Sequence, residues 1–143
     1  SLELYKKNDR DRFVFYFRKI NRGVKMSEVI LGDCLENLKK MKSNSIDMIY
    51  LDPPFFTQRT QKGIMKNTEK TLEFNDSWQN INEYLDYIKV RLIEMKRVLK
   101  NTGSIFLHCD KIASHYLRVL LDEVFGFTNF QSEIIWSYKR WSN

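Results

Sequence analysis

Residues 46–55 read IDMIYLDPPF, a short and mostly apolar run that passes directly into Asp52, Pro53, Pro54 and Phe55. The run has the length and the residue types of a buried β-strand. Each proline fixes its own φ at about −65° and keeps the preceding residue out of the helical region, so Asp52 and Pro53 are expected to be extended. The stretch predicts a catalytic loop at a strand end. An ordinary turn is the alternative, because Asp and Pro both favour turns.

The chemistry open to this loop is the acceptance of hydrogen bonds from a planar NH2 group. Asp52 offers carboxylate oxygens and Pro53 offers a carbonyl oxygen, so together they can accept both hydrogens of one amine. The ring of Phe55 can stack on the ring that carries this amine. These residues indicate that the substrate group is an exocyclic amine.

The rest of the chain alternates apolar runs with helical periodicity, which is the order expected of parallel strands joined by crossover helices. One compact α/β unit is therefore predicted. The clearest helix begins at Asn80, which forms a capping box with Glu83, and residues 101–103 (NTG) are expected to end it. Strands are expected at residues 28–31, 46–51, 104–109 and 130–138, and helices at residues 34–41, 81–99 and 112–125.

The polar segment between Phe55 and Asp76 shows little periodicity. A loop of this length is uncommon unless it is functional or disordered. Its place directly after the Asp-Pro-Pro-Phe turn predicts a mobile loop that closes over the substrate. Plain disorder without substrate is the alternative, and the two are compatible.

Length and composition exclude several classes of protein. No apolar stretch approaches the roughly 18 residues of a membrane span, and nothing at the start has the pattern of a signal peptide, so a soluble cytoplasmic protein is expected. Cys34 and Cys109 form no CxxC pattern and have no histidine at ligand spacing. Neither a disulfide framework nor a metal site is predicted, and both cysteines are expected to be small buried hydrophobes.

The net charge of +6 is concentrated at the start of the chain. Residues 1–25 hold eight Lys/Arg and three Asp/Glu, so they carry five of the six net charges. A basic arm (1–25) ahead of a nearly neutral domain (26–143) suits a nucleic-acid partner. A solvated, poorly ordered leader is the favoured alternative, although residues 13–17 (FVFYF) are aromatic enough to add an edge strand.

Four blocks in order along the chain carry a family resemblance. Residues 32–36 (GDCLE), 46–55, 97–105 (RVLKNTGSI) and 133–136 (EIIW) resemble successive motifs of site-specific DNA amino-methyltransferases. The match is to the circularly permuted class, in which the catalytic loop precedes the glycine-rich cofactor loop. The resemblance implies a partial Rossmann-like methyltransferase domain that depends on S-adenosylmethionine, with a mainly parallel sheet.

The resemblance also implies roles for single residues. Asp52, Pro53, Pro54 and Phe55 would grip the target nitrogen of a base flipped from DNA. An Asp at the first position resembles the adenine-N6 enzymes more than the cytosine-N4 enzymes. Enzymes that act on RNA or on protein glutamine share this kind of loop and remain alternatives, as does a non-catalytic fragment that binds nucleic acid through its basic arm.

Asp33 has two readings. By resemblance it accepts the adenine amino group of S-adenosylmethionine, with the backbone of Cys34 nearby. From the residues alone, a Gly-Asp pair after a strand is a turn in which Asp33 caps the next helix. One role is expected to exclude the other.

The chain has two histidines, His108 and His115. His108 and Asp110 flank a strand end on the ligand side, but methyl transfer to an amine depends on lone-pair positioning more than on early proton removal. His108 is therefore predicted to be a packed or solvent-touched residue rather than a general base. His115 is predicted to lie on the surface.

The glycine-rich cofactor loop of the family is missing, because the five glycines are all isolated. The chain looks like the catalytic half of a longer enzyme whose DNA recognition region lies beyond Asn143. Alone it is predicted to be inactive and to show unpaired strand edges and uncovered apolar faces. A restriction-modification partner is compatible with the family, and the oligomeric state stays open, a homodimer included.

Overall fold

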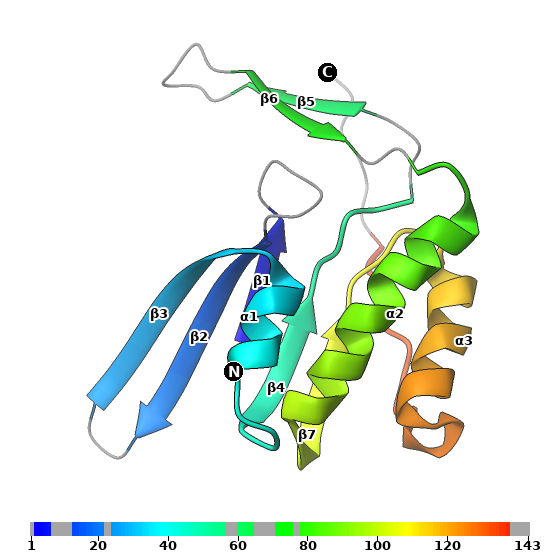
Figure 1. Ribbon diagram of the computed structural model, residues 1–143. Helices are drawn as coiled ribbons and strands as arrows, with labels where there is room; N and C mark the ends of the chain where they lie inside the picture. The colour runs from blue at the N-terminus through cyan, green and yellow to red at the C-terminus, as the bar shows by residue number, and fades with distance from the viewer. Residues whose placement is uncertain are drawn as a thin grey trace.

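A computed structural model of the chain describes residues 2–6, 13–21, 24–56, 60–64, 71–75 and 78–137 (Figure 1). Within these residues the largest sheet has five strands in the order β3-β2-β1-β4-β7. Its members are β1 (Leu2–Lys6), β2 (Phe13–Asn21), β3 (Val24–Gly32), β4 (Ile46–Leu51) and β7 (Leu99–Leu107).

Four of the five strands run in the same direction. β1 pairs parallel to β4, and β4 pairs parallel to β7. β2 is antiparallel to both β1 and β3, so β3 also runs with β4. The predicted α/β class with a mainly parallel sheet is confirmed.

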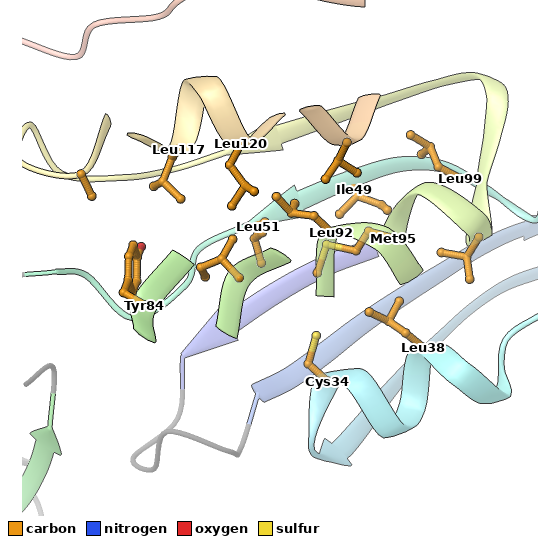
Figure 2. Packing of buried hydrophobic residues seen from close by; sticks show 14 of the residues in the cluster. Cys34, Leu38, Ile49, Leu51, Tyr84, Leu92, Met95, Leu99, Leu117 and Leu120 are labelled. Atoms are coloured by element: carbon orange, nitrogen blue, oxygen red, sulfur yellow. The ribbon is translucent and has the colours of Figure 1, made fainter. Parts of the chain in front are cut away.

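The helices α1 (Cys34–Lys40), α2 (Ile81–Val98) and α3 (Ser114–Phe125) lie side by side on one face of the sheet (Figure 1). Their apolar stripes meet Ile49 and Leu51 of β4 in one buried cluster (Figure 2). This packing follows from sequence period, because residues three or four apart share a helix face and alternate residues share a strand face.

The start of α2 agrees with the predicted capping box. The Asn80 side chain accepts a hydrogen bond from the Glu83 backbone at 3.0 Å, and the Glu83 carboxylate accepts one from the Gln79 backbone at 2.6 Å. α2 ends at Val98, one residue before the predicted end, but the predicted stop at residues 101–103 is wrong, since β7 begins at Leu99 with no connecting loop and contains these residues. Gly103 lies inside β7, and a Cβ there would come 2.7 Å from a methyl of Leu99, so a larger residue would displace the Leu99 side chain.

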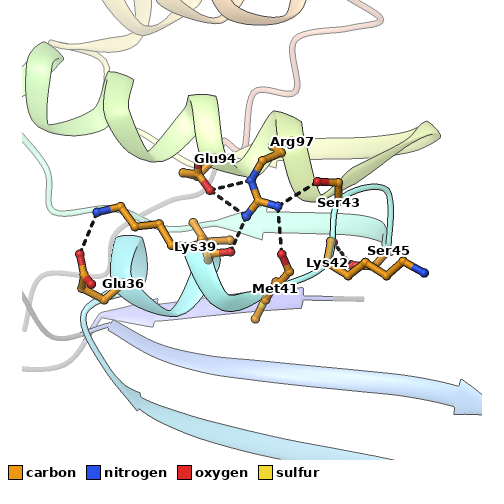
Figure 3. Close-up of polar contacts among 9 residues, drawn as sticks. Glu36, Lys39, Met41, Lys42, Ser43, Ser45, Glu94 and Arg97 are labelled. Carbon is orange, nitrogen blue, oxygen red and sulfur yellow. Dashed lines mark hydrogen bonds and ion pairs between the residues drawn. The ribbon is translucent and has the colours of Figure 1, made fainter.

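Arg97 of α2 holds the carboxyl end of α1 (Figure 3). Its guanidinium donates to the backbone oxygens of Leu38 at 2.7 Å and Met41 at 2.9 Å, and to the Ser43 hydroxyl at 3.0 Å. Glu94 pairs with the same guanidinium at 2.8 Å. Arg97 therefore supplies the partners that the last carbonyl groups of a helix lack.

Other predicted elements also differ in their bounds, and the strand predicted at residues 104–109 is β7, which spans Leu99–Leu107. β3 begins at Val24 rather than at residue 28. α3 begins at Ser114 rather than at residue 112, because the Asp110 carboxylate accepts hydrogen bonds from the backbone of Ile112 and Ala113 and forms a turn there.

The segment predicted to be a long loop contains a hairpin. β5 (Thr60–Ile64) and β6 (Thr71–Asn75) pair antiparallel as a separate two-stranded sheet, beyond the end at which β4 finishes (Figure 1). Short strands that pair only with each other leave no apolar stripe to read, and for that reason the periodicity missed them. The predicted closing motion stays a prediction.

The predicted last strand, residues 130–138, is wrong over its described part. After α3 comes a 3-10 helix, Phe127–Asn129, and residues 130–137 form neither helix nor strand. Their apolar centre is exposed, with Ile135 at 81% and Trp136 at 84%. A strand needs a neighbour for its backbone hydrogen bonds, and none of the described strands pairs with this segment.

The start of the chain also differs from expectation. The favoured alternative was a poorly ordered leader, but β1 and β2 are integral strands of the sheet. The strand predicted around residues 13–17 exists as β2, yet it lies between β3 and β1 rather than at an edge. The division into a basic arm and a catalytic half remains a prediction.

Candidate active site

Three polar residues follow the carboxyl ends of parallel strands in the sheet, of which β4 and β7 are neighbours and β3 is separated from β4 by β2 and β1. Asp33 follows β3, Asp52 follows β4 and His108 follows β7. Because these strands run in the same direction, their carboxyl ends lie at the same edge, which is where open α/β sheets bind ligands. The sequence predicted Asp33 and Asp52 as site residues, and the topology brings them to this shared edge.

The Asp-Pro-Pro-Phe loop is anchored to the end of β7. The backbone of His108 donates to the Leu51 oxygen at 2.8 Å, which extends the strand pairing up to the loop. Pro53 and Pro54 are buried, while Asp52 and Phe55 are half-buried. The loop thus has a packed base with a carboxylate and a ring beside it. The convergence of the Asp52 and Pro53 oxygens on one point remains a prediction.

His108 contacts the ring of Phe55. The two ring centroids lie 5.4 Å apart, with the planes tilted by 51°. His108 is exposed, and the Asp110 carboxylate is engaged with the backbone at the start of α3. Sequence reasoning missed the contact between the two rings. The parallel register of β4 and β7, in which Leu51 faces Leu107, brings His108 beside the loop, and no local sequence pattern reports that register.

Asp33 caps α1, as predicted from the Gly-Asp pair that follows a strand. Its Oδ1 accepts from the Glu36 backbone at 3.0 Å. Its Oδ2 pairs with Arg91 of α2 at 2.9 Å, a partner that sequence reasoning did not find. A carboxylate has about four lone-pair sites, so these two partners leave capacity for a ligand. The capping role is therefore confirmed, and the expectation that it excludes a cofactor role stays a prediction.

The two cysteines behave as apolar residues. Cys34 is fully buried, and this burial raises the pKa of its thiol to about 12, with the Arg91 charge opposing the rise. Burial is also the main cause that raises the pKa of Cys109. A neutral thiol is a poor nucleophile, and the Cys34 side chain packs in the apolar core. Within the ranges described above, no cluster of His, Cys, Asp and Glu has the arrangement of a metal site.

A row of aromatic side chains borders the loop on the α2 side. Phe56 contacts Tyr84, with ring centroids 5.6 Å apart, and Tyr84 contacts Trp78 at 5.2 Å. Trp78 contacts Tyr87 at 5.0 Å, and the Arg91 guanidinium lies 3.6 Å from the Tyr87 ring centroid. The spacing of positions 84, 87 and 91 was the available signal for a shared face on this helix.

Comparison with known proteins identifies the family. Residues 46–143 match the family model N6_N4_Mtase, described as DNA methylase, and the chain belongs to this family. It is 36% identical to the type II methyltransferase M.HinfI of Haemophilus influenzae over 57% of this chain and 24% of that protein. It is 31% identical to the type II methyltransferase M.KpnI of Klebsiella pneumoniae over 76% of this chain and 26% of the relative.

A third relative is the DNA adenine methyltransferase YhdJ of Escherichia coli. The identity is 28%, over 81% of this chain and 35% of YhdJ. The chain thus spans only about a quarter to a third of the length of these three relatives. In the part that the structure covers, no helix has the length and apolarity that crossing a membrane requires.

Proposed function

We propose that this chain is the catalytic part of a DNA amino-methyltransferase that methylates the N6 amine of adenine in a specific DNA sequence. The single observation that carries the proposal is the Asp-Pro-Pro-Phe loop, which stands on a packed base at the ligand edge of the sheet. The family match and the adenine enzyme YhdJ among the relatives support it.

In this proposal the adenine is flipped out of the duplex, at a cost of about a few kcal/mol, and stacks on Phe55. The Asp52 carboxylate and the Pro53 carbonyl accept the two N6 hydrogens. The nitrogen lone pair is thereby drawn out of conjugation with the ring and aimed at the methyl group. Asp52 also stabilises the positive charge that develops on nitrogen.

S-adenosylmethionine would supply the methyl group, and Asp33 with the backbone of Cys34 would hold its adenine. Asp33 fits this part of the cofactor, because it keeps lone pairs beyond those engaged by Glu36 and Arg91, whereas Cys34 would have to expose its buried backbone. The methionine end needs a further binding loop, since this sequence has no Phe-x-Gly-x-Gly. The 143-residue chain alone is therefore proposed to be inactive, and methyl incorporation into DNA by it would refute this.

The test is the Asp52→Ala variant of the complete enzyme. We expect loss of methyl transfer with cofactor binding retained, because Asp52 contacts the base and not the cofactor. Phe55→Ala should weaken base stacking by about 1 to 3 kcal/mol. Preserved turnover in Asp52→Ala would reject the assignment.

The chemical nature of the acceptor needs a separate experiment. Analysis of the methylated products formed on DNA, RNA and protein distinguishes adenine-N6 from cytosine-N4 and from the non-DNA alternatives. A double-stranded DNA substrate and membership of a restriction-modification system, with a nuclease partner, belong to the proposal. Methylcytosine as the main DNA product would replace adenine with cytosine and leave the loop mechanism intact.

A further inference from the structure

The most buried ion pair in the described part of the chain joins Asp33 to Arg91. The side chains are 24% and 8% exposed, and Oδ2 lies 2.9 Å from Nη2. A buried ion pair adds little stability compared with apolar residues of the same volume, because both charges lose their hydration. The burial of this pair therefore points to a role for a fixed charge at this place.

Arg91 is held on its far side by Tyr87, one turn earlier in α2. The guanidinium lies over the Tyr87 ring, and Nη1 donates to the Tyr87 backbone oxygen at 3.0 Å. A planar guanidinium that is stacked and hydrogen-bonded loses most of its freedom. Its Nη2, which donates to Asp33 Oδ2 at 2.9 Å, then fixes the orientation of the Asp33 carboxylate.

The contacts continue from Tyr87 to the catalytic loop. Trp78 packs against Tyr87 and Tyr84, and Tyr84 packs against Phe56. Phe56 is the neighbour of Phe55 in sequence. An unbroken series of ring and charge contacts thus connects Asp33, at the end of β3, with the loop at the end of β4.

We propose that Arg91 is a positioning residue that orients Asp33 and, through this aromatic row, couples the state of Asp33 to the loop of Asp52–Phe55. The cofactor role of Asp33 rests on the proposed function, whereas the coupling rests on the contacts alone. Binding of an amino group at Asp33 changes the ion pair between Asp33 and Arg91. The contacts between the rings then transmit this change from Arg91 to Phe56.

The coupling is tested first without any ligand. In a Trp136→Phe/Trp141→Phe background Trp78 is the sole tryptophan. Asp33→Asn keeps an oxygen for the helix cap but removes the charge that Arg91 faces. We expect a shift in Trp78 emission and faster amide hydrogen exchange at Phe55 and Phe56.

The matched control for this substitution is Asp47→Asn, which removes the partner of Lys100 in an exposed ion pair. It should change neither the emission nor the exchange. If Asp33→Asn also leaves both unchanged while the protein remains folded, the coupling is overturned.

The positioning role is tested by titration of the complete enzyme with S-adenosylmethionine, and the unsubstituted complete chain is the reference. Arg91→Lys keeps the charge and loses the planar fork, so we expect about tenfold weaker binding with a melting temperature within about 4 °C of the unsubstituted chain. Arg118→Lys is the control, because Arg118 also pairs with an acid, Asp122, and lies over a ring, that of Phe130. Its affinity should be unchanged.

An affinity of Arg91→Lys within about twofold of the unsubstituted chain would overturn the positioning role. A loss of affinity that follows the loss of stability would do the same, because it would make Arg91 merely structural. If the unsubstituted complete chain binds no cofactor, the cofactor role of Asp33 and the positioning role fail together, and the emission and exchange measurements alone decide the coupling.

Discussion

The two faces of the five-stranded sheet are covered differently. On the face of α1, α2 and α3, Ile49 and Leu51 of β4 are buried, whereas Tyr50 between them is 37% exposed on the opposite face. Its register partner in β7, Phe106, is 44% exposed, and no α-helix in the described ranges covers this face. Parallel sheets are usually covered on both faces. The buried core thus lies on the helix side of β4, whereas Tyr50 and Phe106 form exposed apolar surface on the other side.

The largest effect is expected at the centre of the covered face. Leu92→Ala removes a fully buried side chain and leaves a cavity, so the free energy of unfolding should fall by about 2–5 kcal/mol in urea titrations. Ile93→Ala, at the next position, is 49% exposed in the native protein and should change stability by only about 0.5 kcal/mol. Equal losses at both positions would contradict the assignment of the core.

Arg97→Ala tests the attachment of α1 to α2 on the same face. It removes donors to the Leu38 and Met41 carbonyl groups, and the free energy of unfolding should fall by about 1–3 kcal/mol. Arg118→Ala removes a more exposed ion pair with Asp122 and should cost about 1 kcal/mol at most. Urea unfolding of both variants gives the comparison, and the larger loss must occur at Arg97.

The buried thiol of Cys34 predicts a pH dependence. Its pKa is about 12 in the fold against 9.0 for an ordinary thiol, so the folded state favours the neutral form. This contribution is present below pH 9 and is lost as the pH rises toward 12. The stability difference between the unsubstituted chain and Cys34→Ala should shrink by about 1 kcal/mol from pH 8 to pH 10. A difference that is constant with pH would contradict the burial of the thiol.

The smallest change in stability is expected on the uncovered face. Phe106→Thr removes exposed apolar surface and keeps a residue that favours strands, so the free energy of unfolding should change by about 0.5 kcal/mol. Sedimentation at high protein concentration should show less self-association than in the unsubstituted chain. A loss as large as that of Leu92→Ala would mean that this face is packed after all.

Much of the fold was readable from the chain because the signals are local. The cap at Asn80 and the stripe that follows it depend on residues three or four apart, and α2 was predicted almost in full. The strand before the Asp-Pro-Pro-Phe loop was predicted with its observed bounds. The prediction of a strand at the end of the chain is wrong for residues 130–137. Their apolar run meets the local requirement for a strand, but the segment has no paired neighbour among the described strands.

For the candidate site, too, the residues found from local motifs differ from the contacts that only the structure shows. The loop residues 52–55 and Asp33 were identified from motifs, and their catalytic and cofactor roles remain proposals. The contacts of Asp33 with Arg91 and of Phe55 with His108 join residues 58 and 53 positions apart. No pattern over a few residues encodes such pairs.

The sequence by itself determined the family and the class of fold, because both depend on residue types at short and fixed spacing. Only the tertiary structure decided that β1 and β2 enter the sheet, that Asp33 faces Arg91 and that no α-helix in the described ranges covers Tyr50 and Phe106. The physical reason is that strand pairing and buried charge pairs are long-range choices among many compatible partners. Packing resolves these choices, and local propensity does not.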